Sequence, residues 1–82
     1  QKSNVNNLSK NERQKIENRI IEIEAKIAEL EEDLKSLTLK MSDSEIASNA
    51  EKFQKTNTQY QIVETTIQNL YSEWEELLEK IQ

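Results

Sequence analysis

Residues 16–41 read IENRIIEIEAKIAELEEDLKSLTLKM, and their apolar side chains recur at alternating intervals of four and three residues. This spacing is the heptad pattern of a helix that presents one apolar stripe to a partner helix. The positions on this stripe are Ile16, Ile20, Ile23, Ile27, Leu30, Leu34, Leu37 and Met41. The stretch therefore predicts one long helix that packs against another helix.

The composition of the chain favours long helices over a broad globular core. Its 82 residues fit one small domain at most, with 34% hydrophobic and 33% charged residues. Glycine, proline and cysteine are all missing, so the residues that usually form tight turns, break helices or crosslink small folds are absent.

The second half of the chain carries its own apolar stripe. Every seventh residue from Ile46 to Ile81 is apolar and is assigned to the d positions: Ile46, Phe53, Tyr60, Ile67, Trp74 and Ile81. The a positions between them are Ala50, Asn57, Glu64, Tyr71 and Leu78. A flanking row consists of Val63, Leu70 and Leu77. All four aromatic residues fall on this seam, which favours a packing role over base stacking.

The two stripes are out of phase by two residues, so one continuous helix would place them on different faces. Two capping boxes mark helix starts, Ser9 with Glu12 and Ser42 with Glu45. The fold class predicted is all-α, a single antiparallel two-helix coiled-coil hairpin. We expect an irregular segment at 1–8, a helix at 9–38, a turn at 39–42 and a helix at 43–80. The alternative is a longer loop, with helix resuming near Glu51.

A turn centred near residue 40 also predicts which residues face each other. Glu64 would lie near Ile16, within reach of Arg13 and Arg19, and an ion pair there is a hypothesis that would explain a charge at an a position. Trp74 would lie near Leu8 and Val5, where it would hold the N-terminal segment against the base of the hairpin.

Several classes of chemistry are excluded. Without His or Cys the chain has no zinc site of the usual kind and no Ser-His or Cys-His nucleophile. Without Gly it has no phosphate-cradling loop. We therefore expect no catalytic, metal or cofactor-binding residue. The longest apolar run is two residues, so no membrane span is expected and a cytoplasmic location is predicted. A start at Gln1 is interpreted as a fragment of a larger protein.

The net charge of −5 has the wrong sign for a strong nucleic-acid binder, yet the basic residues are clustered. One cluster lies around the predicted tip and the other at the start of the first helix. The candidates for nucleic-acid contact are Lys35, Lys40, Lys52 and Lys55 at the tip, and Lys10, Arg13, Lys15 and Arg19 at the base. The alternative is that these are ordinary solvated helix faces.

Two end segments resemble a known family: LSKNERQKIENRIIEIEAKIAELEEDL at 8–34 and LYSEWEELLEKI at 70–81. Together they are similar to the C-terminal coiled-coil domain of ABC-F ATPases, particularly the Uup type. The matching motif residues are Leu8, Ser9 and Glu12 in the first segment and Tyr71, Trp74, Glu75, Glu76 and Leu77 in the second. Family members often carry Pro in the first helix and Asp-Pro near the hinge. Both are missing here, so the hinge conformation transfers least.

The resemblance implies a parent protein that binds ATP and Mg²⁺ in upstream cassettes and acts at the ribosome in translation or antibiotic resistance. In the Uup type the tail resembles a DNA-binding module. The resulting expectation is a non-catalytic accessory arm, monomeric in isolation, that contacts DNA or ribosomal RNA without sequence specificity. The alternative is a protein-interaction hairpin whose row Val63, Leu70 and Leu77 docks on the parent's cassettes or another partner. Self-association would require that the hairpin does not close.

Overall fold

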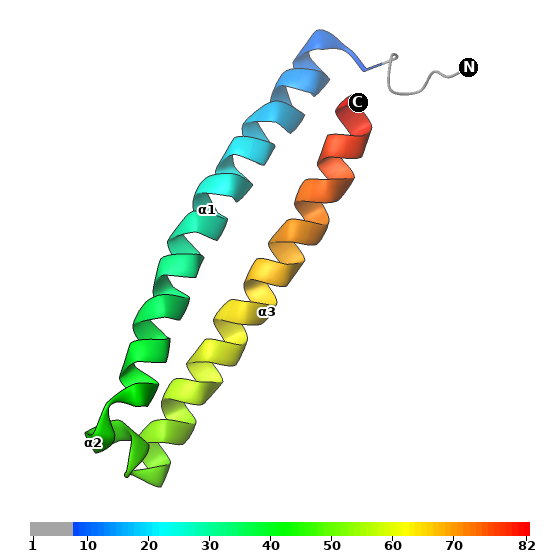
Figure 1. The fold of residues 1–82 in the computed structure, drawn as a ribbon. Coiled ribbons are helices and arrows are strands. Elements are labelled where there is room, and N and C mark those ends of the chain that lie inside the picture. The colour runs from blue at the N-terminus through cyan, green and yellow to red at the C-terminus, as the bar shows by residue number, and fades with distance from the viewer. Residues whose placement is uncertain (1–7) are drawn as a thin grey trace.

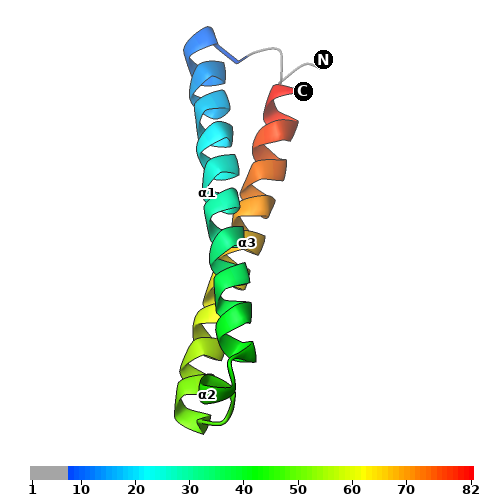
Figure 2. The ribbon, with the colours of Figure 1, turned by 60° about the vertical axis from the view of Figure 1, so that its left-hand side comes forward.

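The computed structural model describes residues 8–82, which form two long helices and one short one. Helix α1 spans Lys10–Ser42, α2 spans Ser44–Ala47 and α3 spans Ala50–Ile81. Figures 1 and 2 show α1 and α3 side by side and antiparallel, with α2 at one end. The principal extents are 60 × 18 × 13 Å. The predicted all-α hairpin is confirmed. The segment predicted to be irregular, with Val5, falls almost wholly outside the described residues.

Helix α1 begins with the capping box predicted at Ser9. The Ser9 hydroxyl accepts from the Glu12 amide at 3.1 Å, and the Glu12 carboxylate accepts from the Ser9 amide at 3.0 Å. Two amides that the helix leaves without partners are thereby satisfied. Hydrogen bonding to the Glu12 carboxyl by the Ser9 backbone, and secondarily by the Ser9 side chain, lowers the pKa of Glu12.

The hinge lies further along the chain than predicted. Helix α1 continues through 39–42 to Ser42, so Ser42 caps nothing, and its hydroxyl donates to the Thr38 carbonyl at 3.2 Å. The cap of α2 is Asp43, whose carboxylate accepts from the Glu45 amide at 2.8 Å. An aspartate is a strong N-cap and needs no preceding serine. The capping box predicted at Ser42 is therefore wrong.

Two residues, Ser48 and Asn49, connect α2 to α3, and Asn49 is the N-cap of α3. Asn49 is extended, with φ −111° and ψ 107°, and its side chain accepts from the Lys52 amide at 3.0 Å. Asp43 is extended as well, with φ −68° and ψ 128°. Within residues 8–82 no residue has positive φ. The chain reverses through two extended caps joined by one helical turn, and this geometry needs no glycine.

The inner face of α1 follows the heptad stripe. Ile20, Ile23, Ile27, Leu30 and Leu37 are buried, while Ile16, Leu34 and Met41 are half-buried. Ile23 is the most enclosed of these, with 0% of its surface exposed. The stripe occupies eight successive a and d positions of the heptad and forms one side of the interface between the two helices.

The inner face of α3 is rotated from the one predicted. Eight of its half-buried and buried residues form one stripe with an alternating four-and-three spacing: Thr56, Tyr60, Val63, Ile67, Leu70, Trp74, Leu77 and Ile81. The other half-buried residues, Asn57, Thr66, Glu73 and Leu78, lie beside this stripe. Val63, Leu70 and Leu77 pack against the cluster of Ile23, Ile27, Leu30 and Ile67. This row was predicted to flank the seam, and it lies within it. The row of Val63, Leu70 and Leu77 faces α1 because all three side chains are aliphatic, whereas the predicted a row contains Asn57 and Glu64.

The rotation moves the predicted a row outward. Glu64 is exposed, Tyr71 is 42% exposed, and Asn57 and Leu78 are half-buried. Phe53, near the hinge, is 39% exposed. Placing every aromatic side chain within the seam was therefore wrong for Tyr71 and Phe53, although Tyr60 and Trp74 do lie on it.

A buried threonine interrupts the apolar seam near the hinge. Thr56 is enclosed, and its hydroxyl donates to the Lys52 carbonyl one turn earlier at 3.0 Å. Since the hydroxyl is satisfied within its own helix, its burial leaves no orphaned polar group. The seam tolerates this residue at the cost of a smaller apolar contact.

The contrast between two isoleucines tests the packing. Ile23→Ala removes a fully buried side chain and should lower the free energy of unfolding by about 2–5 kcal/mol. Ile21→Ala is the matched control, because Ile21 is 63% exposed, and should change it by no more than about 0.5 kcal/mol. Urea unfolding followed by circular dichroism measures both.

If Ile23→Ala leaves too little folded protein to measure, Ile23→Val should still cost about 0.5–1.5 kcal/mol. Equal effects at positions 21 and 23 would contradict the packing of Ile23 against α3.

Candidate nucleic-acid interface

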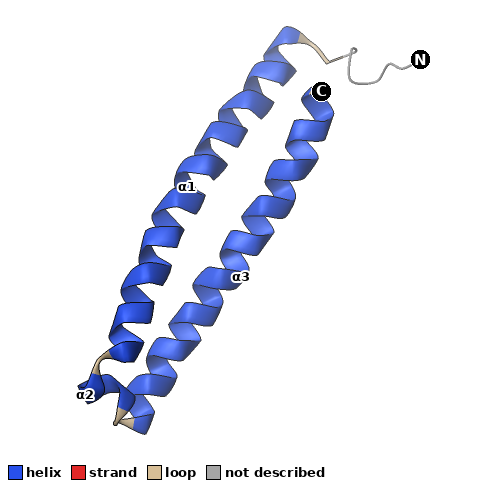
Figure 3. Cartoon of the chain, in the orientation of Figure 1, coloured by secondary structure: helices blue, strands red, loops and turns tan. Residues whose placement is uncertain are grey.

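The four tip lysines come from the two helix ends that meet at the hinge. Lys35 and Lys40 lie in the last turns of α1, and Lys52 and Lys55 lie in the first turns of α3. Figure 3 shows these ends joined by the short loops on either side of α2. The fold thus gathers at one end of the hairpin the candidates that the sequence placed around its tip.

Charge is distributed unevenly along the hairpin. Residues 35–55 contain four lysines and three acidic residues, a formal charge of +1. Residues 8–34 and 56–82 together contain six basic and thirteen acidic residues, a formal charge of −7. The arms as a whole would therefore repel an anionic polymer, and the tip would repel it least.

Two of the tip lysines have a carboxylate neighbour. Lys35 Nζ lies 3.4 Å from Glu32, and Lys52 Nζ lies 3.8 Å from Glu45. Both pairs are on the surface, so they contribute little stability and exchange readily for another anion. Lys40 and Lys55 have no carboxylate within 4.0 Å among residues 8–82. They are the tip cations most available to a phosphate.

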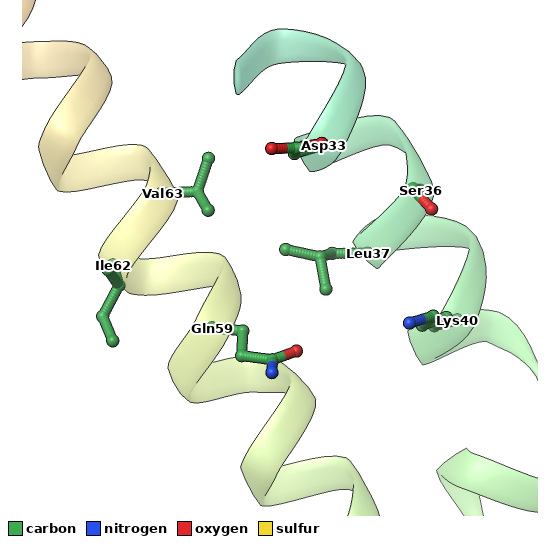
Figure 4. Close-up of a pocket in the computed structure, with 7 residues that line it drawn as sticks. All are labelled: Asp33, Ser36, Leu37, Lys40, Gln59, Ile62 and Val63. Carbon is green, nitrogen blue, oxygen red and sulfur yellow. The ribbon is translucent and has the colours of Figure 1, made fainter. Parts of the chain in front are cut away.

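Lys40 borders an open groove between α1 and α3. Figure 4 shows Leu37 and Val63 approaching each other across it, with the Lys40 side chain extended toward Gln59. Asp33, Ser36 and Ile62 complete its lining, and its volume is about 330 Å³. The groove has an apolar floor, with the Lys40 ammonium group at one side. Asp33, the acidic residue of its lining, lies two helical turns further from the hinge than Lys40.

The base group of cations is less free than the tip group. Arg19 is held by Glu73, with Nε to Oε2 at 2.8 Å and Nη2 to Oε1 at 3.0 Å, and also by Glu22 at 3.2 Å. Arg13 lies 3.4 Å from Glu17, and its Nη2 donates to the Ile81 carbonyl at 3.1 Å. Both arginines bind their own hairpin. Lys10 and Lys15 are exposed in the first turns of α1.

The partner of Arg19 differs from the one predicted. Glu73 forms the two-pronged pair, whereas Glu64 is exposed and lies nine residues earlier on α3. The ion pair hypothesised for Glu64 is wrong because the hinge lies beyond residue 42, which shifts every opposed position toward the C-terminus. Hydrogen bonding to Arg19 lowers the pKa of Glu73 and outweighs the opposing desolvation. The same bonds raise the pKa of Arg19.

The residue opposite Trp74 also lies nearer the hinge than predicted. Its indole Nε1 donates to Glu24 Oε2 at 3.0 Å, and its ring packs against the buried cluster around Ile27. It does not contact Leu8 as predicted, and Val5 lies outside the described residues. The Tyr71 ring stands edge-on to the Trp74 ring, with centroids 6.1 Å apart and planes at 86°. The sequence did not single out Glu24 or Glu73, because the residues that they contact depend on the register between α1 and α3.

Residues 8–82 contain no group of three or more potential metal-ligating side chains. Among the same residues, no helix combines the length and apolarity that crossing a membrane requires.

Comparison with known families supplies the wider context. The family described as ABC transporter C-terminal domain matches residues 7–79, which is most of the chain and includes both long helices. The chain belongs to this family. No curated protein and no solved structure matches it. The chain is therefore an accessory domain of an ABC-type protein, a class whose members are ATPases.

For this ABC C-terminal domain, a double-mutant cycle on Arg19 and Glu73 tests the register. Arg19→Ala and Glu73→Ala should couple, while Arg19→Ala and Glu64→Ala should not, since Glu64 is not opposite Arg19. Thermal unfolding of the wild type, the single variants and the double variants gives both couplings. Coupling to Glu64 instead of Glu73 would contradict the hinge position.

The same cycle should depend on pH. The pKa of Glu73 is lower in the folded state than its ordinary value of 4.5, so on acidification the unfolded chain takes up its proton first. The stabilisation is complete above about pH 4.5 and is lost as the pH falls through the folded-state pKa. The Arg19–Glu73 coupling should therefore be present at pH 7 and disappear in acid. A coupling unchanged down to pH 2 would exclude a carboxylate origin.

Proposed function

We propose that this ABC C-terminal domain is a non-catalytic accessory arm of an ABC-F type ATPase, whose hinge end contacts the phosphates of DNA or ribosomal RNA without sequence specificity. The observation that carries the proposal is the segregation of charge, with +1 at the tip and −7 along the arms. Backbone phosphates attract lysines irrespective of sequence, because base edges are not read.

Contacts that the basic residues make within the hairpin favour the tip over the base as the site of phosphate contact. Arg13 and Arg19 are both engaged with groups of α1 and α3, so recruiting them to a phosphate would require breaking contacts that hold the two helices together. Lys40 and Lys55 would form phosphate contacts without that loss. The tip lysines are thus the principal contact, and Lys10 and Lys15 are secondary candidates.

The competing protein-docking role has less surface than the sequence suggests. Val63, Leu70 and Leu77 are half-buried against the central cluster, so only part of each side chain is left for the parent's cassettes or a second copy. The parent's activity, with ATP and Mg²⁺ in its cassettes and a role in translation or antibiotic resistance, is the setting in which this arm would act.

Lysine neutralisation tests the tip. Lys40→Gln with Lys55→Gln should weaken binding to a random-sequence DNA duplex and to a structured RNA. If each lysine meets one phosphate, the slope of log affinity against log salt should become shallower by about 1.8. Fluorescence anisotropy at several salt concentrations measures affinity and slope together.

The matched control is Lys26→Gln with Lys80→Gln, which removes the same charge from the arms. Its slope should remain that of the wild type. Lys10→Gln with Lys15→Gln reports on the base. Absence of binding by the wild-type chain at low salt, or equal losses in all three pairs, would reject the tip as a phosphate contact.

Trp74→Ala separates stability from binding. Because Trp74 packs in the arm and bonds to Glu24, its removal should lower the melting temperature. Below that temperature, nucleic-acid affinity should stay within about twofold of the wild type, because distant sites act independently. Lost affinity in a chain still folded by circular dichroism would assign the arm a direct contact.

A further inference from the structure

A second groove lies on the flank of the arms, between α1 and α3. Glu24, Ile27, Ala28 and Glu31 line it from α1, and Tyr71 and Trp74 line it from α3, around a volume of about 320 Å³. The small side chain of Ala28 leaves room between the two glutamates. The groove therefore has an apolar and aromatic floor with a carboxylate at each end of its α1 side.

Hydrogen bonds from the aromatic residues position both carboxylates. Glu24 Oε2 accepts from Trp74 Nε1 at 3.0 Å, and Glu31 Oε2 accepts from the Tyr71 hydroxyl at 3.4 Å. Each bond uses one oxygen of its carboxylate. A carboxylate has about four acceptor positions on its two oxygens, so both groups retain the capacity to accept from a ligand.

Neither glutamate is neutralised by the hairpin itself. Within residues 8–82, ion pairs of 4.0 Å or less involve other acids, including Glu29 with Lys26 and Glu32 with Lys35. The residues one turn from Glu24 on α1 are Ile20, Ile21, Ile27 and Ala28, none of which is basic. One turn beyond Glu31 lies Lys35, which pairs with Glu32 at 3.4 Å. The arms around the groove have a formal charge of −7. An arriving cation would thus gain attraction without displacing an existing partner.

From this geometry we propose that the groove between α1 and α3 binds a basic helix of a partner protein. The partner's Arg or Lys head groups bond to Glu24 and Glu31, and their aliphatic stems pack on Tyr71 and Trp74. Arginine suits such a site because its planar group bonds to carboxylates and stacks on aromatic rings. A helix fits because two paired helices leave a groove in which a third packs.

The spacing of the two carboxylates defines the ligand further. Glu24 and Glu31 are seven residues apart on one helix, which corresponds to about 10.5 Å along its axis. One head group cannot reach both. A partner helix would match them with basic residues at positions i and i+7, which share one of its faces. This contact lies on the arm and is independent of the phosphate contact proposed for the tip.

The test uses the full 82-residue chain and a capped alanine-based helical peptide. The peptide carries two arginines seven residues apart, with a leucine between them on the same face. Trp74 is the only tryptophan of the chain and lies in the groove, so its fluorescence reports binding. We expect a saturable change at an ionic strength of about 0.15 M, where charges beyond about 8 Å are screened. A peptide of equal composition with arginines five residues apart should bind at least about fivefold more weakly.

Glu24→Gln with Glu31→Gln should weaken binding about tenfold, since both charge-assisted bonds are lost. Glutamine can still accept from the Trp74 and Tyr71 donors, so the fold should persist, and a thermal melt checks this. The matched control is Glu29→Gln with Glu32→Gln, which removes the same charge from α1 outside the groove and should change affinity by no more than about twofold.

Three results would overturn the proposal. The first is an absence of any saturable fluorescence change with the wild-type chain. The second is an equal loss of affinity in the two glutamate pairs, which would indicate attraction to the acidic arms as a whole. The third is equal binding of the two peptides, which would show that the spacing of the carboxylates is not read.

Discussion

The pairing of one apolar stripe of α1 with one of α3 is the constraint on which the rest of this hairpin depends. Among the described residues no second layer of helix or sheet covers either helix, so a side chain is enclosed only where it faces the other helix. Ile23, Ile27, Leu30 and Ile67 form the central cluster. Helices in proteins gain most of their stability from such packing of an apolar face rather than from intrinsic propensity. The register of the stripes then decides which polar groups meet.

The fold class could be predicted because α1 contains one uninterrupted heptad series with no competing apolar row. The phase of α3 could not, because two rows that both contain apolar residues lie side by side on it: one with Val63, Leu70 and Leu77, the other with Tyr71 and Leu78. Leu70 lies three residues after Ile67, and Tyr71 lies four residues after it. A heptad seam alternates steps of three and four residues, so either residue could continue the seam from Ile67. What decides between them is the partner surface. The uniformly aliphatic row turns inward, and Glu64 and Tyr71 turn outward.

The position of the hinge determined how much of the candidate site could be predicted. The cap signals of Asp43 and Asn49 were present in the sequence, but Ser42 offered a competing box. Since a hinge displaced along the chain shifts every opposed pair, it replaced Glu64 by Glu73 and moved Trp74 from Leu8 to Glu24. The tip lysines were insensitive to this error, because any hinge between 39 and 49 brings the end of the first helix to the start of the last.

Polar contacts across the pair share a common feature, which bears on how one hairpin could serve two partners. Arg19 with Glu73, Trp74 with Glu24 and Tyr71 with Glu31 all lie on the flanks of the arms, away from the hinge. They hold the register in the half of the molecule where acidic residues are in excess. The tip, with its lysines in weak pairs or none, contributes little to holding the helices together. Its charges can therefore change partners without loosening the seam, whereas the glutamates of the flank are held in place by the aromatic residues of α3.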